Sequence, residues 1–572
     1  MTKIFDDPEE FADDQLAGFL DLYSDRLRGV PGGVVSLPDG EPKVAVVIGG
    51  GSGHYPAFCG TVGPGLATGA VVGNIFTSPS AAQAYSVGRA ADQGRGVVFS
   101  FGNYAGDIMN FGIAAERLRK EGIDTRVVVV TDDVASADDP EQRRGIAGDF
   151  SVFKAMGAAA AAGADLDEVE RVGRASNAAT RTLGVAFSGC TMPGAGAPLF
   201  QVPAGHLGLG LGIHGEPGIE DVPLLPAEKL AALLVERLLA DAPDGGASTR
   251  VAPILNGLGT TKYEELFLLW RHVSSLLRER GLTPVQPEVG ELVTSLDMGG
   301  VSLTLQWLDD ELEALWTADA YTPAYRKLAA PVARLDRTAV ADGAGEAGAQ
   351  EVAGPASEAA RSLARTVVDA LRGLQAVVAE HEDELGRIDA VAGDGDHGRG
   401  MLKGANAALR RAEDAPAEAG VAWVLGRAGR AWAEQAGGTS GVLWGAALEA
   451  FGAALGDERD AYGPALVADA IDAFAESVQD LGRAQAGDKT LLDALLPFAA
   501  SFREQVATGA GTAEAWTVAA DAATQGARAT AAMRPKVGRA RPLAEKSVGT
   551  PDAGATSLSL VVTRVGELLG AR

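Results

Sequence analysis

Several features are scarce in this chain of 572 residues, and each scarcity excludes a class of protein. Only two cysteines occur, Cys59 and Cys190, which are too few for a disulfide framework and lack the Cys/His spacing of a zinc site. Positive charge is also in deficit, because 49 Lys and Arg stand against 76 Asp and Glu and leave a net charge of −27. Such a surface repels nucleic-acid phosphates and anionic lipids, so we expect no nucleic acid and no membrane as a partner.

Long apolar runs and a basic leader are missing as well. No uninterrupted apolar stretch approaches the ~20 residues of a membrane span, and the N-terminus MTKIFDDPEEFADD is acidic where a secretory signal is basic. We therefore expect a cytoplasmic protein. The 47% of apolar and 22% of charged residues are typical of folded domains, and the length indicates roughly three to four of them.

One segment divides the chain by composition. Residues 340–356 read VADGAGEAGAQEVAGPA, a Gly/Ala/Glu-rich stretch with hardly any large apolar residue, which is typical of a linker. β-Branched runs dominate before it, and Ala, Leu, Arg and Glu at helical spacing dominate after it. We predict an α/β region over residues 1–335 with two lobes (about 1–183 and 184–335), a linker over 336–356 and an all-α domain over 357–572.

Three apolar runs in the first region predict buried parallel strands, at 44–48, 97–101 and 127–130. Each run is followed by a polar segment, GGGSGHYP, GNYAGD and TDDVA in turn. Ligands of an open α/β sheet lie at the carboxyl ends of the strands, so we expect these segments to converge on one crevice. A strand-like run at 301–307 and a helical stretch at 263–280 indicate the second α/β lobe.

These segments contain candidate site residues. The glycine-rich segment 49–53 would let backbone N–H groups approach a small polar ligand, although such segments also serve as plain tight turns. His54 and Asp107 could act as an acid/base pair on a common ligand. His214 lies among glycines in LGIHGEPG, a setting that exposes it to a ligand, whereas a lone histidine is more often structural.

Five motifs in sequence order carry a family resemblance. GGGSGH, NIFTSPS at 74–80, NYAGD, TDDVA and GIHGEPGIE together resemble the ketose-binding subunit of the dihydroxyacetone kinases, from about residue 10 to about residue 330. The resemblance implies that His214 captures the substrate ketone as a covalent hemiaminal and that His54 and Asp107 are the acid/base groups. An imidazole nitrogen that adds to a carbonyl would fix a small ketose with its terminal hydroxyl toward the phosphate donor. The resemblance also places the substrate against Gly51, Ser52 and Gly53.

Three positions depart from the family pattern. Where the family has GHEPxH, this chain has Tyr55 in place of the acid and Phe58 in place of the second histidine. Where the family has a lysine before NYxGD, this chain has Gly102. The lost lysine removes a charge and a long side chain near the substrate and would leave room. We interpret this change as a preference for a somewhat larger ketose such as erythrulose, with neutral drift at these positions as the alternative.

Three carboxylates, Asp389, Asp394 and Asp396, lie within eight residues of one another on a glycine-broken loop that enters a predicted helix. Mg²⁺ is usually held by a few carboxylates together with phosphate oxygens, so the loop indicates a magnesium–nucleotide site. An isolated acidic loop is more often only solvated. Four further motifs, GGTSG, GDKTLLD, GRA and DAGA, follow it in order.

With the acidic loop, these motifs resemble the nucleotide-binding subunit of the dihydroxyacetone kinases over about residues 357–572. That subunit is an all-helical barrel that holds ATP through metal ions, so the resemblance implies two Mg²⁺ ions on the three aspartates. The family's GRASYLGERS reads GRARPLAEKS and its DPG reads DAG, which leaves the adenine and ribose contacts open. The implied nucleotide residues are His397, Gly398, Arg399, Gly400, Thr439, Ser440, Gly482, Leu491, Arg539, Asp552, Ala553 and Gly554.

A chain that fuses both modules resembles the ATP-dependent type of this system. We therefore predict an ATP-dependent kinase for the terminal hydroxyl of dihydroxyacetone or erythrulose, and the resemblance also implies a homodimer. Two alternatives stay open. One is cyclisation of FAD to riboflavin cyclic phosphate at the same nucleotide site, and the other is a regulator that senses a ketose without turning it over.

Overall fold

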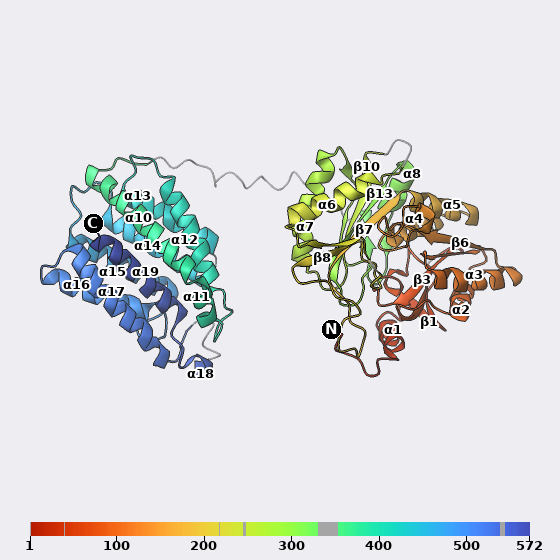
Figure 1. Ribbon diagram of the computed structural model, residues 1–572, viewed down its shortest axis with the longest axis horizontal. Helices are drawn as coiled ribbons and strands as arrows, with labels where there is room; N and C mark the ends of the chain where they lie inside the picture. Colours follow the sequence, from red (N-terminus) through yellow and green to blue (C-terminus); the bar gives the residue numbers. More distant parts are fainter. Residues whose placement is uncertain are drawn as a thin grey trace. The chain divides into compact units, whose positions relative to one another are not determined.

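The computed structural model describes residues 2–38, 40–216, 218–243, 248–329, 353–436, 438–537 and 544–571. The chain forms two compact units, Met1–Ala341 and Asp342–Arg572 (Figure 1). Most of the predicted linker, residues 336–352, lies outside the described residues. In the described parts, no helix combines the length and the apolar character that crossing a membrane requires.

The first lobe of unit 1 is built on a six-stranded sheet in the order β1-β2-β4-β3-β5-β6. The three apolar runs are confirmed as strands, and β3 pairs in parallel with β4 and β5, as β5 does with β6. β1 and β2 extend the sheet in antiparallel fashion. The strands are β1 Leu27–Val30, β2 Gly33–Ser36, β3 Ala45–Ser52, β4 Gly69–Ile75, β5 Val97–Gly102 and β6 Thr125–Val130.

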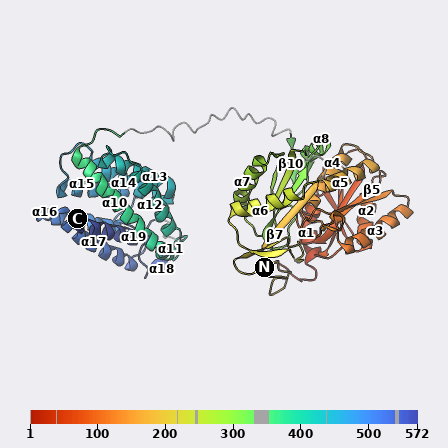
Figure 2. The same ribbon diagram turned by 45° about the horizontal axis from the view of Figure 1, so that its top comes forward.

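Helices cover both faces of this sheet (Figure 2). Phe99 and Phe101 of β5 pack with Phe111 of α3 on one face, whereas Val98 belongs to the core on the other face with Phe150 of α4. The alternation follows from the two-residue period of a strand and explains the continuous apolar runs. The helices are α1 Phe11–Leu22, α2 Ala81–Ala91, α3 Ala105–Lys120, α4 Asp149–Ala161 and α5 Leu166–Ala178.

The second lobe contains a seven-stranded sheet in the order β11-β10-β13-β7-β8-β9, with β12 beside β10. Two helices, α6 Ala227–Ala240 and α7 Tyr263–Glu279, bury their leucines against one face of this sheet. The predicted boundary at residues 183 and 184 falls inside β7, so the first sheet and its helices end before Thr180. The remaining elements are β7 Thr180–Ser188, β8 His206–Leu209, β9 Glu220–Pro223, β10 Arg250–Gly257, β11 Thr283–Pro284, β12 Glu288–Gly290, β13 Gly299–Trp307, α8 Asp310–Thr317, β14 Ala320–Tyr321 and β15 Arg326–Lys327.

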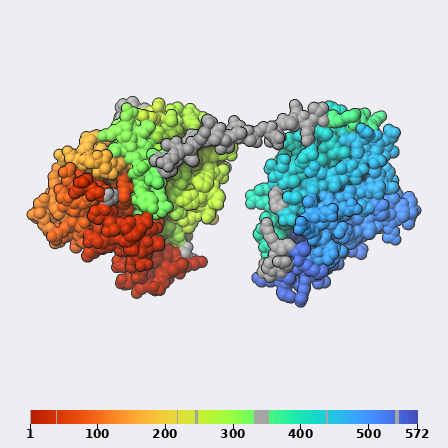
Figure 3. Space-filling model, turned by 180° about the vertical axis from the view of Figure 1, so that it is seen from behind, coloured from red at the N-terminus to blue at the C-terminus, as the bar shows by residue number. Residues whose placement is uncertain are grey.

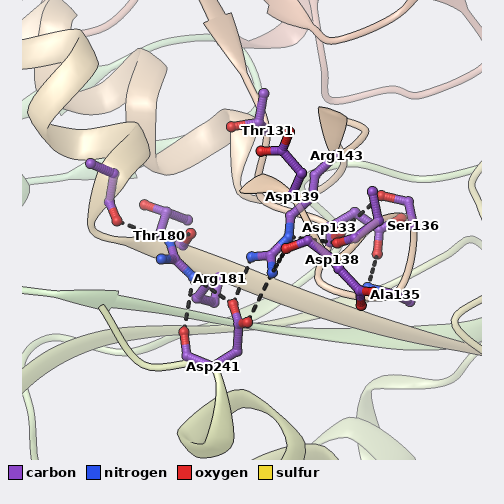
Figure 4. Close-up of polar contacts among 12 residues, drawn as sticks. Thr131, Asp133, Ala135, Ser136, Asp138, Asp139, Arg143, Thr180, Arg181 and Asp241 are labelled. Atoms are coloured by element: carbon purple, nitrogen blue, oxygen red, sulfur yellow. Dashed lines mark hydrogen bonds and ion pairs between the residues drawn. The ribbon is translucent and has the colours of Figure 1, made fainter. Parts of the chain in front are cut away.

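The two lobes of unit 1 share one hydrophobic core, which contains Phe150 of α4, Ile254 of β10 and Trp316 of α8. They meet without a gap in the view from behind (Figure 3). An ion-pair cluster adds to the contact, because the Asp241 carboxylate at the end of α6 accepts hydrogen bonds from Arg143 at 2.6 and 2.8 Å and from Arg181 at 2.8 Å (Figure 4).

The elements that the structure describes in unit 2 are all helical, as the sequence predicts. Apolar residues at helical spacing, such as Leu371, Leu374 and Val378 of α10, face a common core. Inside it lies an apolar cavity of about 180 Å³, lined among others by Trp444 and Trp516. The helices are α10 Glu358–Glu380, α11 Glu382–Asp389, α12 His397–Glu413, α13 Val421–Ala436, α14 Gly438–Leu455, α15 Pro464–Gly482, α16 Leu492–Ala507, α17 Thr512–Ala529, α18 Ala544–Ser547 and α19 Ala553–Gly570.

Candidate active site

The glycine-rich segment forms the end of strand β3, whereas the sequence predicts a turn after the strand. Gly49–Gly51 pair in parallel with β4, and close packing requires the absence of side chains. A β-carbon at Gly50 would lie 2.7 Å from the ring of Phe58, and one at Gly51 would lie 2.6 Å from the backbone nitrogen of Thr77. Tertiary packing therefore explains these two glycines. The Ser52 hydroxyl beside them is buried and has no hydrogen-bond partner among the described residues.

Two histidines from different lobes meet at the end of β3. The Nε2 atoms of His54 and His214 are 3.0 Å apart, and Nδ1 of His54 lies 2.7 Å from the carbonyl oxygen of Thr294. Nδ1 of His214 lies 2.8 Å from one carboxylate oxygen of Glu216, whose other oxygen accepts the backbone N–H of His214 at 2.9 Å. Glu216 thus fixes both the ring and the backbone of His214.

The carbonyl of Thr294 fixes where the protons lie, because it can only accept. Nδ1 of His54 therefore donates, its Nε2 accepts, and one proton lies between the two Nε2 atoms. Burial, followed by the charge of His214, lowers the pKa of His54 to about 3, so its ring stays neutral. Burial opposes the ionisation of Glu216, but the hydrogen bond and charge of His214 outweigh it and lower the pKa of Glu216 to about 2.

Asp107 lies in the first turn of α3, where the charge of His214 acts on its carboxyl group. Its Oδ1 accepts a hydrogen bond from the Ser78 hydroxyl at 2.8 Å, and the residue is buried. Burial raises the pKa of Asp107 to about 6, although the hydrogen bond from Ser78 opposes this shift. A carboxylate whose pKa lies close to the working pH suits a proton acceptor.

The residues at the three positions that depart from the family pattern pack closely against neighbouring residues. Phe58 lies in the core, with its ring centroid 6.2 Å from that of Phe153 and, edge-on, 6.4 Å from that of His54. The ring of Tyr55 lies 6.1 Å from that of Phe19, and Tyr55 is 43% exposed. A β-carbon at Gly102 would lie 3.0 Å from the ring of Tyr104 and 3.1 Å from a backbone oxygen of the loop before α4. The space directly beside Gly102 is thus occupied, which differs from the expectation that the lost lysine leaves room there.

In unit 2, the oxygen atoms of Asp389, Asp394 and Asp396 lie within 4.8 Å of one another. Asp389 ends α11 and Asp396 immediately precedes α12, and the N–H of Gly395 between them donates to Asp389 at 2.8 Å. Gly395 has a φ of +78°, which a side chain would strain. Three carboxylates at this spacing form a hard-oxygen donor set that fits Mg²⁺.

The three aspartates line a cavity of about 330 Å³. Two of the implied nucleotide residues are not among those that line it. Gly398 packs against the backbone of Glu382, where a β-carbon would lie 2.0 Å from the carbonyl oxygen, and Arg399 is exposed on α12. Arg539 lies outside the described residues. The other implied nucleotide residues line the cavity: His397, Gly400, Thr439, Ser440, Gly482, Leu491, Asp552, Ala553 and Gly554.

Lys489 is a further residue of this cavity that the sequence reasoning did not select. Its ammonium group donates to the backbone carbonyls of Met533, Ser547 and Thr550 at 3.2, 2.7 and 2.9 Å. Burial lowers the pKa of Lys489. The lysine therefore links Met533 to Ser547 and Thr550 beside the cavity, and its place within the GDKTLLD motif is the sequence signal for it.

Comparisons with known proteins agree with both halves. The Dak1 domain model matches residues 17–324 and the DAK2 domain model matches residues 391–567. The chain is 58% identical over 572 residues to a D-erythrulose kinase of Mycolicibacterium smegmatis, covering 99% of this chain and 98% of that protein. It is 52% identical over 578 residues to an L-erythrulose kinase of Pectobacterium atrosepticum, covering 100% and 97%.

A solved structure has the same two-domain fold. The dihydroxyacetone kinase from C. freundii in complex with AMP-PNP and Mg²⁺ has 29% sequence identity and a TM-score of 0.60, with 99% of each chain covered. The chain therefore belongs to the dihydroxyacetone kinase family, as a single-chain, ATP-dependent member. The resemblance inferred from the motifs is confirmed.

Proposed function

We propose that this chain transfers the γ-phosphate of ATP to the terminal hydroxyl of erythrulose, which it holds covalently on His214. The observation that carries the proposal is the pair of facing Nε2 atoms, 3.0 Å apart, with a carboxylate behind one ring and a carbonyl behind the other. The substrate class follows from the relatives, two of which are erythrulose kinases at 58% and 52% identity over nearly the full chain.

The site supplies both the nucleophile and the proton that capture of the ketone requires. Nε2 of His214 attacks the carbonyl carbon, the carbonyl oxygen receives the electron pair of the broken π bond, and it takes the proton that lay between the two Nε2 atoms. The product is a hemiaminal with a neutral hydroxyl on an alkylated imidazolium ring. The carboxylate of Glu216, 2.8 Å from Nδ1, neutralises that ring throughout.

Phosphoryl transfer then requires a proton acceptor and charge neutralisation. We assign the acceptor role to Asp107, which takes the proton of the terminal hydroxyl while Ser78 holds the carboxylate in place. Asp389, Asp394 and Asp396 would hold Mg²⁺, which when bound neutralises the negative charge of the transferring phosphate. The cavity lined by Thr439, Ser440, Gly482, Leu491 and their neighbours would take the nucleotide.

The proposal also includes the number of metal ions, the arrangement of the helices in unit 2, and the location and oligomeric state of the protein. Two Mg²⁺ ions on the three aspartates would offset the charge that the carboxylates and the triphosphate bring together. A barrel arrangement of the helices is supported by the apolar cavity that α10, α13–α17 and α19 surround. We also propose a cytoplasmic homodimer, on the resemblance of the ketose-binding half to its family.

An assay of ATP consumption with D-erythrulose, L-erythrulose, dihydroxyacetone and glyceraldehyde tests the function. We expect turnover to be fastest with one erythrulose enantiomer, and no turnover with any of the four would overturn the proposal. His214→Ala should form no ketose adduct in intact-protein mass spectrometry, whereas the matched control His206→Ala, on β8, should retain it. Release of riboflavin cyclic phosphate from FAD with Mn²⁺, without ketose phosphorylation, would instead support the cyclase alternative.

A further inference from the structure

We propose that Phe76 is a positioning residue for ketose capture, whose ring holds the imidazole of His54 against that of His214. The proposal rests on the proposed function, because it concerns the step in which His214 adds to the ketone. None of the motif-derived site residues includes Phe76. It follows Ile75, the last residue of β4, in the NIFTSPS segment.

The backbone of Phe76 adopts a conformation that its side chain disfavours. Its φ is +53°, in the left-handed region that a residue with a β-carbon enters only at a cost. The turn is held by two hydrogen bonds, from the N–H of Phe76 to the carbonyl of Ser52 and from the N–H of Thr77 to the carbonyl of Asn74, both at 3.0 Å. Strain at one residue of a candidate site suggests that the position of its side chain matters for function.

The glycine-rich end of β3 provides the space that Phe76 occupies. A β-carbon at Gly53 would lie 2.8 Å from the ring of Phe76, and one at Gly51 would lie 2.9 Å from its Cα. Larger residues at either glycine would therefore displace Phe76. The glycines that the sequence associates with the substrate serve, in the structure, to admit this aromatic side chain.

The ring of Phe76 contacts both reacting histidines. It stacks on His54 with a centroid distance of 5.0 Å and an interplanar angle of 28°, and it meets His214 edge-on at 5.3 Å and 79°. The two imidazoles meet each other edge-on at 4.8 Å and 83°. Three rings in mutual contact leave His54 little freedom to turn its Nε2 away from His214.

The same ring covers one face of the buried His54 imidazole. Burial is the main cause of the low pKa of His54, ahead of the charges of His214 and Glu216 that face it. A protonated His54 could not accept the proton of His214 and would leave that Nε2 blocked. Phe76 thus supports capture in two ways, by fixing the angle between the rings and by keeping His54 neutral.

Phe76→Gly separates this role from a merely structural one. Glycine adopts a φ of +53° without strain, and this relief offsets part of the packing that is lost with the ring, so the variant should fold with a lowered thermal midpoint. We expect its adduct with 2-¹³C-erythrulose, measured by NMR, to weaken about tenfold from the loss of two ring contacts. We also expect capture to fail below about pH 6.5, the ordinary range for a solvated histidine, where the wild type still captures.

Two matched variants serve as controls. Phe76→Tyr retains the ring and should restore capture, whereas Phe99→Leu removes a buried aromatic ring of β5 and should lower the thermal midpoint without changing the pH profile of capture. Wild-type affinity and an unchanged pH profile in Phe76→Gly would overturn the role of Phe76. If Phe76→Gly does not fold, the same outcome in Phe76→Leu, which has apolar bulk but no flat ring, overturns it. A wild-type chain that forms no adduct overturns the proposed function itself.

Discussion

In the proposed mechanism, Glu216 controls how firmly His214 is held for attack on the ketone. One carboxylate oxygen faces Nδ1 of His214 at 2.8 Å and the other accepts its backbone N–H at 2.9 Å. The pKa of Glu216 is lowered from 4.5 to about 2 despite the opposing effect of burial. At ~1.36 kcal/mol per pH unit, this difference corresponds to about 3 kcal/mol of preference for the charged carboxylate in the folded site. Partial exposure of the side chain screens some of it and leaves about 2 kcal/mol.

Glu216→Gln should therefore weaken the ketose adduct by about 30-fold, the equivalent of 2 kcal/mol. Glutamine retains the shape, but it accepts only one of the two His214 N–H groups that the carboxylate accepts, and it does not neutralise the imidazolium ring of the adduct. Glu216→Ala removes the acceptor as well and should weaken the adduct further. Titration with 2-¹³C-erythrulose, followed by the NMR signal of the hemiaminal carbon, measures the dissociation constant directly.

A matched control separates the site from a general loss of negative charge. Glu220→Gln, on β9 in the same lobe, removes an exposed carboxylate and should leave the adduct unchanged. The pH dependence has a definite sign, because the stability from a lowered carboxylate pKa is fully present above pH 4.5 and is lost as the pH falls through about 2. Glu216 therefore causes no loss of capture between pH 5 and 8. Unchanged affinity in Glu216→Gln would refute the reasoning.

Three further predictions follow from the described contacts. Because burial raises the pKa of Asp107 to about 6, kcat/KM should fall as the pH drops below ~6, and a flat pH–rate profile down to pH 5 would contradict its role as proton acceptor. Asp241→Asn leaves the buried Arg143 without its carboxylate, so calorimetry should show unit 1 destabilised by about 3 kcal/mol, whereas an unchanged transition would show the cluster to be dispensable. Asp394→Asn should weaken Mg²⁺ binding about tenfold or more, followed by the fluorescence of Trp432 in the same cavity, and unchanged affinity would remove Asp394 from the metal site.

The sequence predicts those parts of the fold that local patterns determine. Apolar runs of β-branched residues become β3, β5 and β6 because a strand buried on both faces needs apolar side chains on both. The histidines and Asp107 could be selected because they follow such strands or lie in long motifs. The segment Gly49–Ser52 was wrongly predicted as a turn, because pairing with β4 overrides the low strand propensity of glycine.

What the sequence could not predict depends on contacts between distant residues. Nothing local to Phe76 indicates a left-handed backbone, since the space for its ring and Cα depends on Gly53 and Gly51, which lie elsewhere in the chain. The link between Glu216 and His214 spans two residues and was visible in GIHGEPG, but the facing His54 is 160 residues away. The role of Lys489 is hidden from the sequence for the same reason, because its three carbonyl partners lie 44 to 61 residues further along the chain.

The shared core of unit 1 bears on how such a chain can be divided between genes. A division of the chain between β6 and β10 would separate the side chain of Phe150 from those of Ile254 and Trp316, and each fragment would expose an apolar face. Unit 1 and unit 2 each contain hydrophobic clusters of their own. A division of the chain between the two units therefore leaves each core whole, whereas a division between the two lobes of unit 1 would open their shared core.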